Sequence, residues 1–137
     1  MAYWLMKSEP SAWSWDQQVA KGAKGEAWTG VRNHTAKLNI MKMKKGDLAF
    51  FYHSNDGKEI VGIVDIIREH YPDPSDKTGK FVCVDIKADK PLKKPVTLVA
   101  IKAEKALANM DLLKQSRLSV GRVKPDEWRL ICKLAGI

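Results

Sequence analysis

Residues 48–68 have the sequence LAFFYHSNDGKEIVGIVDIIR, and this stretch decides the fold. Leu48 to His53 and Glu59 to Arg68 are rich in aromatic and β-branched residues, which predicts two strands. The segment between them, Ser54–Lys58, contains Gly57 at the position where a tight turn needs a positive φ. We therefore expect a hairpin in the middle of the chain.

Further strands and turns are predicted on both sides of this hairpin. Tyr3–Lys7 is a short apolar run that ends just before a Ser-Glu-Pro turn, and Phe81–Lys87 alternates apolar and polar residues, so both predict strands. Pro72–Gly79 is rich in Pro, Asp, Ser and Gly, which predicts a loop. Pro91–Pro95 predicts a second break, after which Thr97–Met110 contains helical stretches.

Three helices are expected elsewhere in the chain. Ser14 is a candidate N-cap of a short helix, and Gln17 completes a capping box. Asn33 to Met43 has apolar residues at helical spacing and lysines on the opposite face. Pro125–Gly136 begins with Pro, has acidic residues in its first turn and ends at Gly, which predicts a third helix. Leu112–Val120 favours neither helix nor strand.

Four or five strands in a mostly antiparallel order, flanked by short helices, predict an α+β domain built on a small curved sheet or barrel. A chain of 137 residues has room for one domain, residues 1–137. Cys83 and Cys132 each lie in an apolar segment, which favours free thiols in a reducing compartment over a disulfide. No CxxC spacing or Cys/His cluster indicates a metal site, and no cofactor is expected.

The chain is basic, and this balance favours certain partners. Its 24 Lys and Arg residues exceed its 16 Asp and Glu residues, for a net charge of +8. Such a surplus favours an anionic partner, nucleic acid first, although many small basic proteins bind nothing specific. No apolar run approaches the roughly 18 residues of a membrane span, and the N-terminus has no signal-peptide pattern. We expect no membrane partner and a cytoplasmic location, or a nuclear one in a eukaryote.

The segment before the second predicted helix combines residue types that a fold alone seldom requires together. WTGVRN, residues 28–33, places Trp28, Arg32 and Asn33 within six positions. An indole offers a π face, a guanidinium a planar fork of donors, and a carboxamide both a donor and an acceptor. These groups suit a flat, polar heterocycle such as a nucleobase. Each also has a structural alternative, Trp28 as a core residue and Asn33 as a helix N-cap.

Five separated blocks of the sequence resemble a known family. They are YWLMKSEP at 3–10, WTGVRN at 28–33, FYHS at 51–54, IVGI at 60–63 and YPDP at 71–74, with LSV at 118–120 and EW at 127–128 near the end. With these blocks the chain resembles the EVE domain family, which includes the thymocyte nuclear proteins. That family has a PUA-like fold, a small barrel related to the YTH and ASCH domains. The resemblance implies a module that binds DNA or RNA and holds a modified base in an aromatic-lined pocket.

The resemblance also implies which residues form the pocket. They are the Lys7-Ser8-Glu9 corner, the Trp28 segment with Arg32 and Asn33, the strand end His53-Ser54, and Tyr71 and Asp73 in the proline-rich loop. Trp28 is the expected stacking face. Of Trp13 and Trp15, one is expected to pack under a helix and the other to line the pocket. The candidate contacts to the nucleic-acid backbone are Lys37, Lys42, Lys44 and Arg122.

Two other functions fit the sequence. An ASCH-like hydrolase acting on a modified nucleoside would use Lys7 as nucleophile or base together with Glu9. Against this alternative, Lys-x-Glu spacing is common and no Ser/His/Asp set accompanies it. A protein-interaction domain, whose charge only keeps it in solution, is the remaining possibility.

Overall fold

The predicted hairpin forms the centre of the structure. In this computed structural model, which describes residues 1–137, β3 (Leu48–His53) pairs antiparallel with β4 (Glu59–Pro72). Gly57 in the connecting turn has a φ of 91°, as the sequence predicts. Strand β4 continues four residues beyond the predicted Arg68, because it stays paired with the next strand as far as Pro72.

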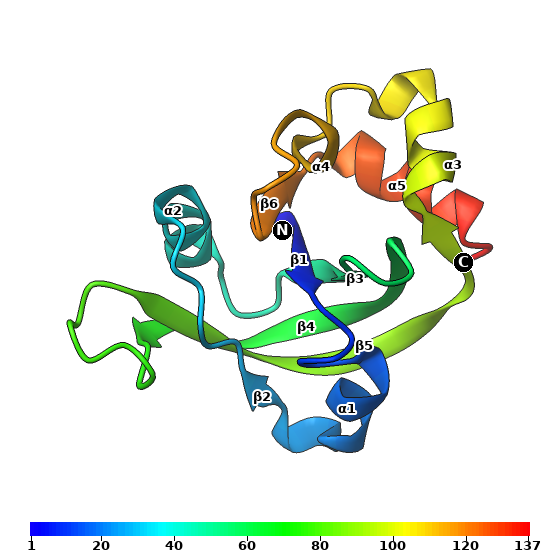
Figure 1. The fold of residues 1–137 in the computed structure, drawn as a ribbon. Helices are drawn as coiled ribbons and strands as arrows, with labels where there is room; N and C mark the ends of the chain where they lie inside the picture. Colours follow the sequence, from blue (N-terminus) through cyan, green and yellow to red (C-terminus); the bar gives the residue numbers. More distant parts are fainter.

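Six strands form one mixed sheet in the order β2-β5-β4-β3-β1-β6 (Figure 1). Strand β1 (Tyr3–Ser8) pairs parallel with β3 and antiparallel with β6 (Val120–Val123), while the short β2 (Glu26–Ala27) pairs with β5 (Val82–Thr97). The predicted α+β class is confirmed. The sheet is curved, but β2 and β6 remain edge strands, so it does not close into a barrel.

One expectation about the strands is wrong, and one strand is present that the sequence does not predict. The sequence predicts a break at Pro91–Pro95, but β5 passes through it and ends at Thr97. Strand β2 pairs with β5 only at Asp85 and Ile86, so beyond them this sheet edge is free and tolerates residues that lack an N–H. Strand β6 was not expected, because its four residues form a strand only through their pairing with β1.

The helices are α1 (Trp15–Ala20), α2 (His34–Lys42), α3 (Leu98–Ala103), α4 (Asp111–Lys114) and α5 (Pro125–Leu134), with 3-10 turns η1 (Gly22–Lys24) and η2 (Lys105–Leu107). The three predicted helices and the helical stretch after Thr97 are confirmed, whereas α4 lies mostly in the segment for which the sequence favours neither helix nor strand. The capping box forms as expected, because Ser14 Oγ accepts from the Gln17 N–H at 3.2 Å and Gln17 Oε1 accepts from the Ser14 N–H at 2.8 Å. No helix is long and apolar enough to cross a membrane, and both cysteines are free thiols.

The two faces of the sheet bury separate hydrophobic clusters. Alternate side chains of a strand point to opposite faces, so Phe51 lies in one cluster while Phe50 and Tyr52 lie in the other. Helices α1 and α2 contribute to the first cluster, and α3 and α5 to the second. Trp28 belongs to the first cluster, which places the candidate site at the margin of the face covered by α1 and α2.

Gly62, on β4, is expected to be the least replaceable glycine of the sheet. A Cβ at Gly62 would overlap the six-membered ring of Trp15, which is buried against Phe51. Gly62→Ala is therefore expected to lower the free energy of unfolding by about 1–3 kcal/mol, the usual cost of overpacking. Urea unfolding measures this loss. The control is Gly121→Ala, where the nearest atom lies 3.3 Å away and the cost should be smaller; equal midpoints for both variants would contradict the argument.

Candidate functional site

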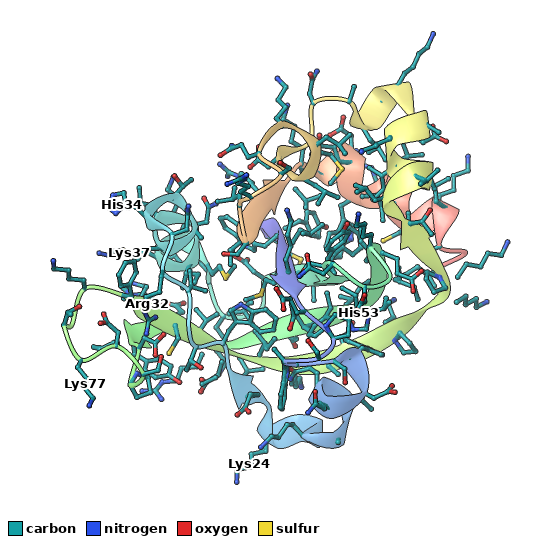
Figure 2. The ribbon with its side chains drawn as sticks, in the orientation of Figure 1. Lys24, Arg32, His34, Lys37, His53 and Lys77 are labelled. Carbon is teal, nitrogen blue, oxygen red and sulfur yellow. The ribbon has the colours of Figure 1, made fainter.

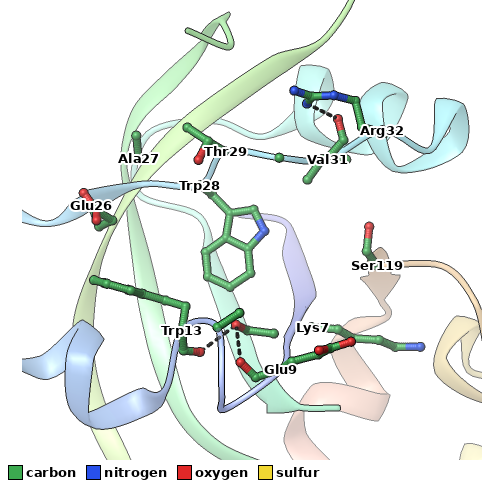
Figure 3. A pocket seen from close by; sticks show the side chains of 13 residues that line it. Lys7, Glu9, Trp13, Glu26, Ala27, Trp28, Thr29, Val31, Arg32 and Ser119 are labelled. Atoms are coloured by element: carbon green, nitrogen blue, oxygen red, sulfur yellow. Dashed lines mark hydrogen bonds between the residues drawn. The ribbon is translucent and has the colours of Figure 1, made fainter. Parts of the chain in front are cut away.

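A half-open cavity of about 450 Å³ lies at one end of the sheet (Figure 3). Three segments that are far apart in the sequence enclose it: the end of β1 with the turn after it, the segment from β2 to the start of α2, and the loop before β6. The residues that line it are Lys7, Ser8, Glu9, Ala12, Trp13, Glu26, Ala27, Trp28, Thr29, Gly30, Val31, Arg32 and Ser119. We call this cavity the aromatic pocket.

Trp28 is both a core residue and a wall of the aromatic pocket. Its indole is only 8% exposed and meets the ring of Phe51 edge-on, with 5.7 Å between centroids. Its backbone N–H donates to the carbonyl of Val84 at 2.8 Å, which fixes this segment against β5. The indole nitrogen takes part in none of the side-chain hydrogen bonds, and since no buried side-chain nitrogen or oxygen lacks a partner, this nitrogen is not sealed in the core. Figure 3 shows the Trp28 ring among the residues that line the pocket. Trp28 can therefore be a core residue and a wall of the pocket at the same time.

Trp13 forms a second aromatic wall of the pocket. Its indole N–H donates to Gln18 Oε1 at 2.9 Å, and Gln18 Nε2 donates to the carbonyl of Ile86 at 3.2 Å. Because Gln18 is fully buried, these two bonds fix the ring of Trp13 relative to β5. Trp15 instead packs beneath α1 against Phe51. Of the two tryptophans considered from the sequence, Trp13 is the one that lines the pocket.

Lys7 and Glu9 both line the pocket, but each is engaged elsewhere. The Lys7 ammonium donates to the carbonyl of Ser116 at 2.8 Å, and burial lowers the pKa of Lys7 from its ordinary value. Glu9 Oε1 accepts from the side-chain amide of Asn55 at 2.7 Å. No ion pair joins the two, and the polar contacts of Lys7 and Glu9 are with Ser116 and Asn55.

Ser8 connects the end of β1 to the wall formed by Trp13. Its hydroxyl donates to the carbonyl of Trp13 at 2.6 Å, so its oxygen lone pairs are left to accept. Its own carbonyl accepts from the backbone N–H of Ser54 at 2.9 Å, which ties the end of β3 to the same corner. Ser54 therefore supports the pocket without lining it.

Asp73 lies behind the pocket and shapes its rim. Its buried carboxylate accepts from the Gly30 N–H at 2.8 Å, from Arg32 Nη1 at 3.3 Å, and from the Ser75 hydroxyl at 2.6 Å. Burial acts to raise the pKa of Asp73, but the hydrogen bonds from Ser75, Gly30 and Arg32 outweigh it and lower that pKa. Gly30 has a φ of 87°, so the chain turns sharply where Asp73 anchors it. Asp73 was predicted as a base contact, and the structure places it as a support for the rim.

Three other predicted site residues also lie outside the lining. Asn33 Oδ1 accepts from the Ala36 N–H at 2.9 Å, so Asn33 is the N-cap of α2. His53 Nε2 accepts from the backbone N–H of Trp15 at 3.0 Å, and burial lowers the pKa of His53 although Glu59 and Asp16 act to raise it. Tyr71 donates to the Asp85 carboxylate, and burial, together with this hydrogen bond, raises the pKa of Tyr71.

The predicted backbone-binding cations are spread over different surfaces. The Lys37 ammonium lies 5.9 Å from the centroid of Phe81, on the same side as Arg32 (Figure 2). Lys42 and Lys44 line a separate depression near the N-terminus, and Arg122 lies over the ring of Trp4. Of these four cations, only Lys37 lies beside a residue that lines the aromatic pocket.

Sequence reasoning missed several lining residues. Glu26 and Ala27 belong to β2, a strand of two residues that the sequence pattern does not reveal. Ser119 comes from the segment that favoured neither helix nor strand, although it lies in the LSV block used for the resemblance. The sequence gives no indication that Ala12 lines the pocket, because alanine occurs in every kind of local environment.

The fold and the pocket together define a class of protein, an α+β domain with a half-open aromatic pocket beside an open mixed sheet. The EVE domain profile matches residues 2–134, and the chain belongs to the EVE domain family. Mouse thymocyte nuclear protein 1 is 34% identical to it over 164 residues, which cover 96% of this chain and 73% of that protein.

Solved structures share this fold along the whole chain. A protein of Rhodopseudomonas palustris, solved by NMR, is 72% identical with a TM-score of 0.94, covering 99% of this chain and 94% of that one. Human THYN1 in complex with DNA containing 5-methylcytosine is 31% identical with a TM-score of 0.91, covering 100% and 99%. The YTH domain of Zygosaccharomyces rouxii MRB1, solved with N6-methyladenosine RNA, has a TM-score of 0.60 over 99% and 85% of the chains at 16% identity, which shows a shared fold alone.

Proposed function

We propose that this domain binds a modified base of DNA or RNA, inserted into the aromatic pocket between Trp13 and Trp28. The observation that carries the proposal is the pocket itself, which combines two indole walls with polar groups from three segments. Its volume of about 450 Å³ lies within the range of small-molecule sites, roughly 300–1,000 Å³, and is ample for a single base. We propose a binding module rather than an enzyme.

Stacking on an indole supplies affinity, and the closeness of the walls supplies selectivity. A base stacked on an aromatic side chain gains roughly 1–3 kcal/mol. A methyl group adds only about 0.8 kcal/mol when buried, or about fourfold in affinity. A preference for a methylated base beyond that factor requires a second wall in contact with the added group. Trp13, fixed in place by Gln18, is that second wall.

The polar lining matches the edge of a nucleobase. The carboxylates of Glu9 and Glu26 are acceptors, as an exocyclic amino group requires, and carboxylates are the usual partners of cytosine N4. The free indole N–H of Trp28 is a donor for a ring nitrogen or carbonyl. The pocket therefore offers both donors and acceptors beside its aromatic walls.

The family relationship supports nucleic acid as the partner. Human THYN1, whose structure contains 5-methylcytosine DNA, shares the fold across the full length of this chain. The net charge of +8 favours the same partner. Neither observation distinguishes DNA from RNA for this chain, so the binding experiment uses oligonucleotides of both kinds.

Binding at fixed salt tests the proposal. Single- and double-stranded DNA and RNA oligonucleotides, identical except for one methylated base, are compared by fluorescence anisotropy. We expect at least one modified strand to bind more than about fourfold more tightly than its unmodified partner. Equal affinities across the whole panel would overturn base recognition. Mass spectrometry of the recovered strands is expected to show no chemical change.

A further inference from the structure

A second pocket lies beside the aromatic pocket. It has a volume of about 320 Å³ and is lined by Asn33, Thr35, Lys114, Gln115, Ser116, Arg117 and Leu118. The two pockets share their walls, because Arg32 lines one and Asn33 the other, while Ser119 lines one and Leu118 the other. Lys7 joins them physically through its hydrogen bond to the Ser116 carbonyl. A ligand that leaves the aromatic pocket on this side meets the second pocket next.

The second pocket has the chemistry of an anion site. Lys114 and Arg117 line it, and neither forms an ion pair, because the three ion pairs of the protein are Lys21–Glu26, Arg32–Asp73 and Arg68–Asp85. No acidic residue lines the pocket, and Leu118 is its one apolar residue. Two cations without a carboxylate partner therefore face the same depression.

The neutral polar residues of the second pocket can all donate a hydrogen bond to a ligand. Asn33 uses its side-chain oxygen to cap α2, which leaves its amide nitrogen free to donate. Thr35, Gln115 and Ser116 add hydroxyl and amide groups. No aromatic side chain is present on which a base can stack. This set suits a phosphate, whose oxygens only accept, better than it suits a second base.

We propose that the second pocket binds a backbone phosphodiester of the same strand whose base enters the aromatic pocket. This inference rests on the proposed function, and it adds a contact that fixes the register of the strand without reading its sequence. It also changes the role of Asn33, which the sequence predicts as part of the base pocket. Asn33 contacts the backbone beside the pocket and not the base within it.

A charge-matched pair of double variants tests the proposal. Lys114→Ala/Arg117→Ala removes both cations of the second pocket. Lys94→Ala/Lys102→Ala removes two exposed lysines, one near the end of β5 that leads into α3 and one on α3 itself. Figure 1 shows α3 on the opposite side of the molecule from α2. We expect the first pair to make the slope of log K against log salt less steep by about 0.7 for single strands or about 0.9 for duplexes, the values for one phosphate contact. The ratio of affinities for modified and unmodified strands should stay unchanged. Equal slopes for the two double variants would overturn the proposal.

Neutral phosphate analogues separate this inference from the proposed function. One methylphosphonate is placed at each position around the base in turn. We expect a methylphosphonate at one of these positions to weaken binding to the wild type but not to the Lys114→Ala/Arg117→Ala variant. Circular dichroism checks that this variant is folded. An equal loss in both proteins at every position would reject the phosphate pocket, even if the base preference holds. If wild type shows no base preference but the analogue effect persists, base recognition fails and the phosphate contact stands by itself.

Discussion

Trp28→Ala is expected to abolish the preference for a modified base while most of the salt-dependent affinity remains. Removing the indole removes a stacking surface worth roughly 1–3 kcal/mol, or about 5- to 150-fold in affinity for a strand whose base occupies the pocket. Contacts to phosphates do not depend on this ring, so unmodified strands should lose little affinity. Anisotropy titrations of paired modified and unmodified oligonucleotides, repeated at several salt concentrations, measure both quantities.

Because Trp28 is buried, a second variant is needed to separate a loss of binding from a loss of stability. Its indole packs against Phe51 and is 8% exposed, so truncation to alanine also costs roughly 3–5 kcal/mol of stability. Trp28→Phe keeps a π face and most of the packing but removes the indole N–H. We expect this variant to stay folded, to bind with intermediate affinity and to show a reduced preference.

Trp128→Phe is the matched control for Trp28→Phe. Trp128 stacks on Phe50 at 3.8 Å, on the face of the sheet away from the pocket. Its replacement should lower stability without changing the preference for a modified base. If Trp28→Phe also leaves the preference unchanged, and Trp28→Ala acts only by unfolding the protein, Trp28 is a core residue and the reading of the pocket is wrong.

Local signals in the sequence predicted the elements that form from local interactions. The hairpin at Gly57 and the capping box at Ser14 depend on residues a few positions apart, and both are present in the structure. Strand β6 depends on pairing with β1 at the other end of the chain. The passage of β5 through Pro91–Pro95 likewise depends on a sheet edge that no local pattern describes.

The same distinction applies to the candidate site. Trp28 and the Lys7-Ser8-Glu9 corner were predicted together, and the structure brings them to one cavity. Asp73 and His53 lie in the matched blocks, but Asp73 holds Gly30 at the pocket rim and His53 holds the backbone N–H of Trp15 at the start of α1. A block of sequence shared with a family identifies a region that contributes to the site. It does not distinguish a residue that touches the ligand from one that positions the residue beside it.

Asp73→Asn is expected to reduce both the stability of the pocket rim and the preference for a modified base. One carboxylate holds Gly30, Arg32 and Ser75, and a carboxamide carries no charge and fewer acceptor positions. Leaving buried donors unsatisfied costs about 1–3 kcal/mol. Since the Arg32 side chain is 42% exposed, most of this cost should come from the backbone N–H groups of Gly30 and Ser75.

The effect of Asp73→Asn should depend on pH in a defined direction. The pKa of Asp73 in the folded protein lies below its unfolded value of about 3.9. Its ionised form therefore contributes stability that is fully present above that value and is lost as pH falls through the folded pKa. The difference in unfolding free energy between wild type and Asp73→Asn should be largest at neutral pH and should shrink as the pH falls below about 4. Urea unfolding at neutral and acidic pH measures this difference.

Asp76→Asn separates a role in the rim from a general effect on the loop after β4. Hydrogen bonds from Thr78, and from the backbone N–H of Phe81, lower the pKa of Asp76 to about 2. Its removal should therefore also lower stability at neutral pH, and that loss should shrink as the pH falls below about 4. Asp76 makes no hydrogen bond to Gly30 or Arg32, so the preference for a modified base should survive in this variant. If Asp73→Asn retains the wild-type preference as well, the rim does not depend on this carboxylate. If both variants lose the preference, the loop as a whole shapes the pocket. Loss in Asp73→Asn alone assigns the effect to the contacts that this carboxylate makes with Gly30, Arg32 and Ser75, and not to the loop as a whole.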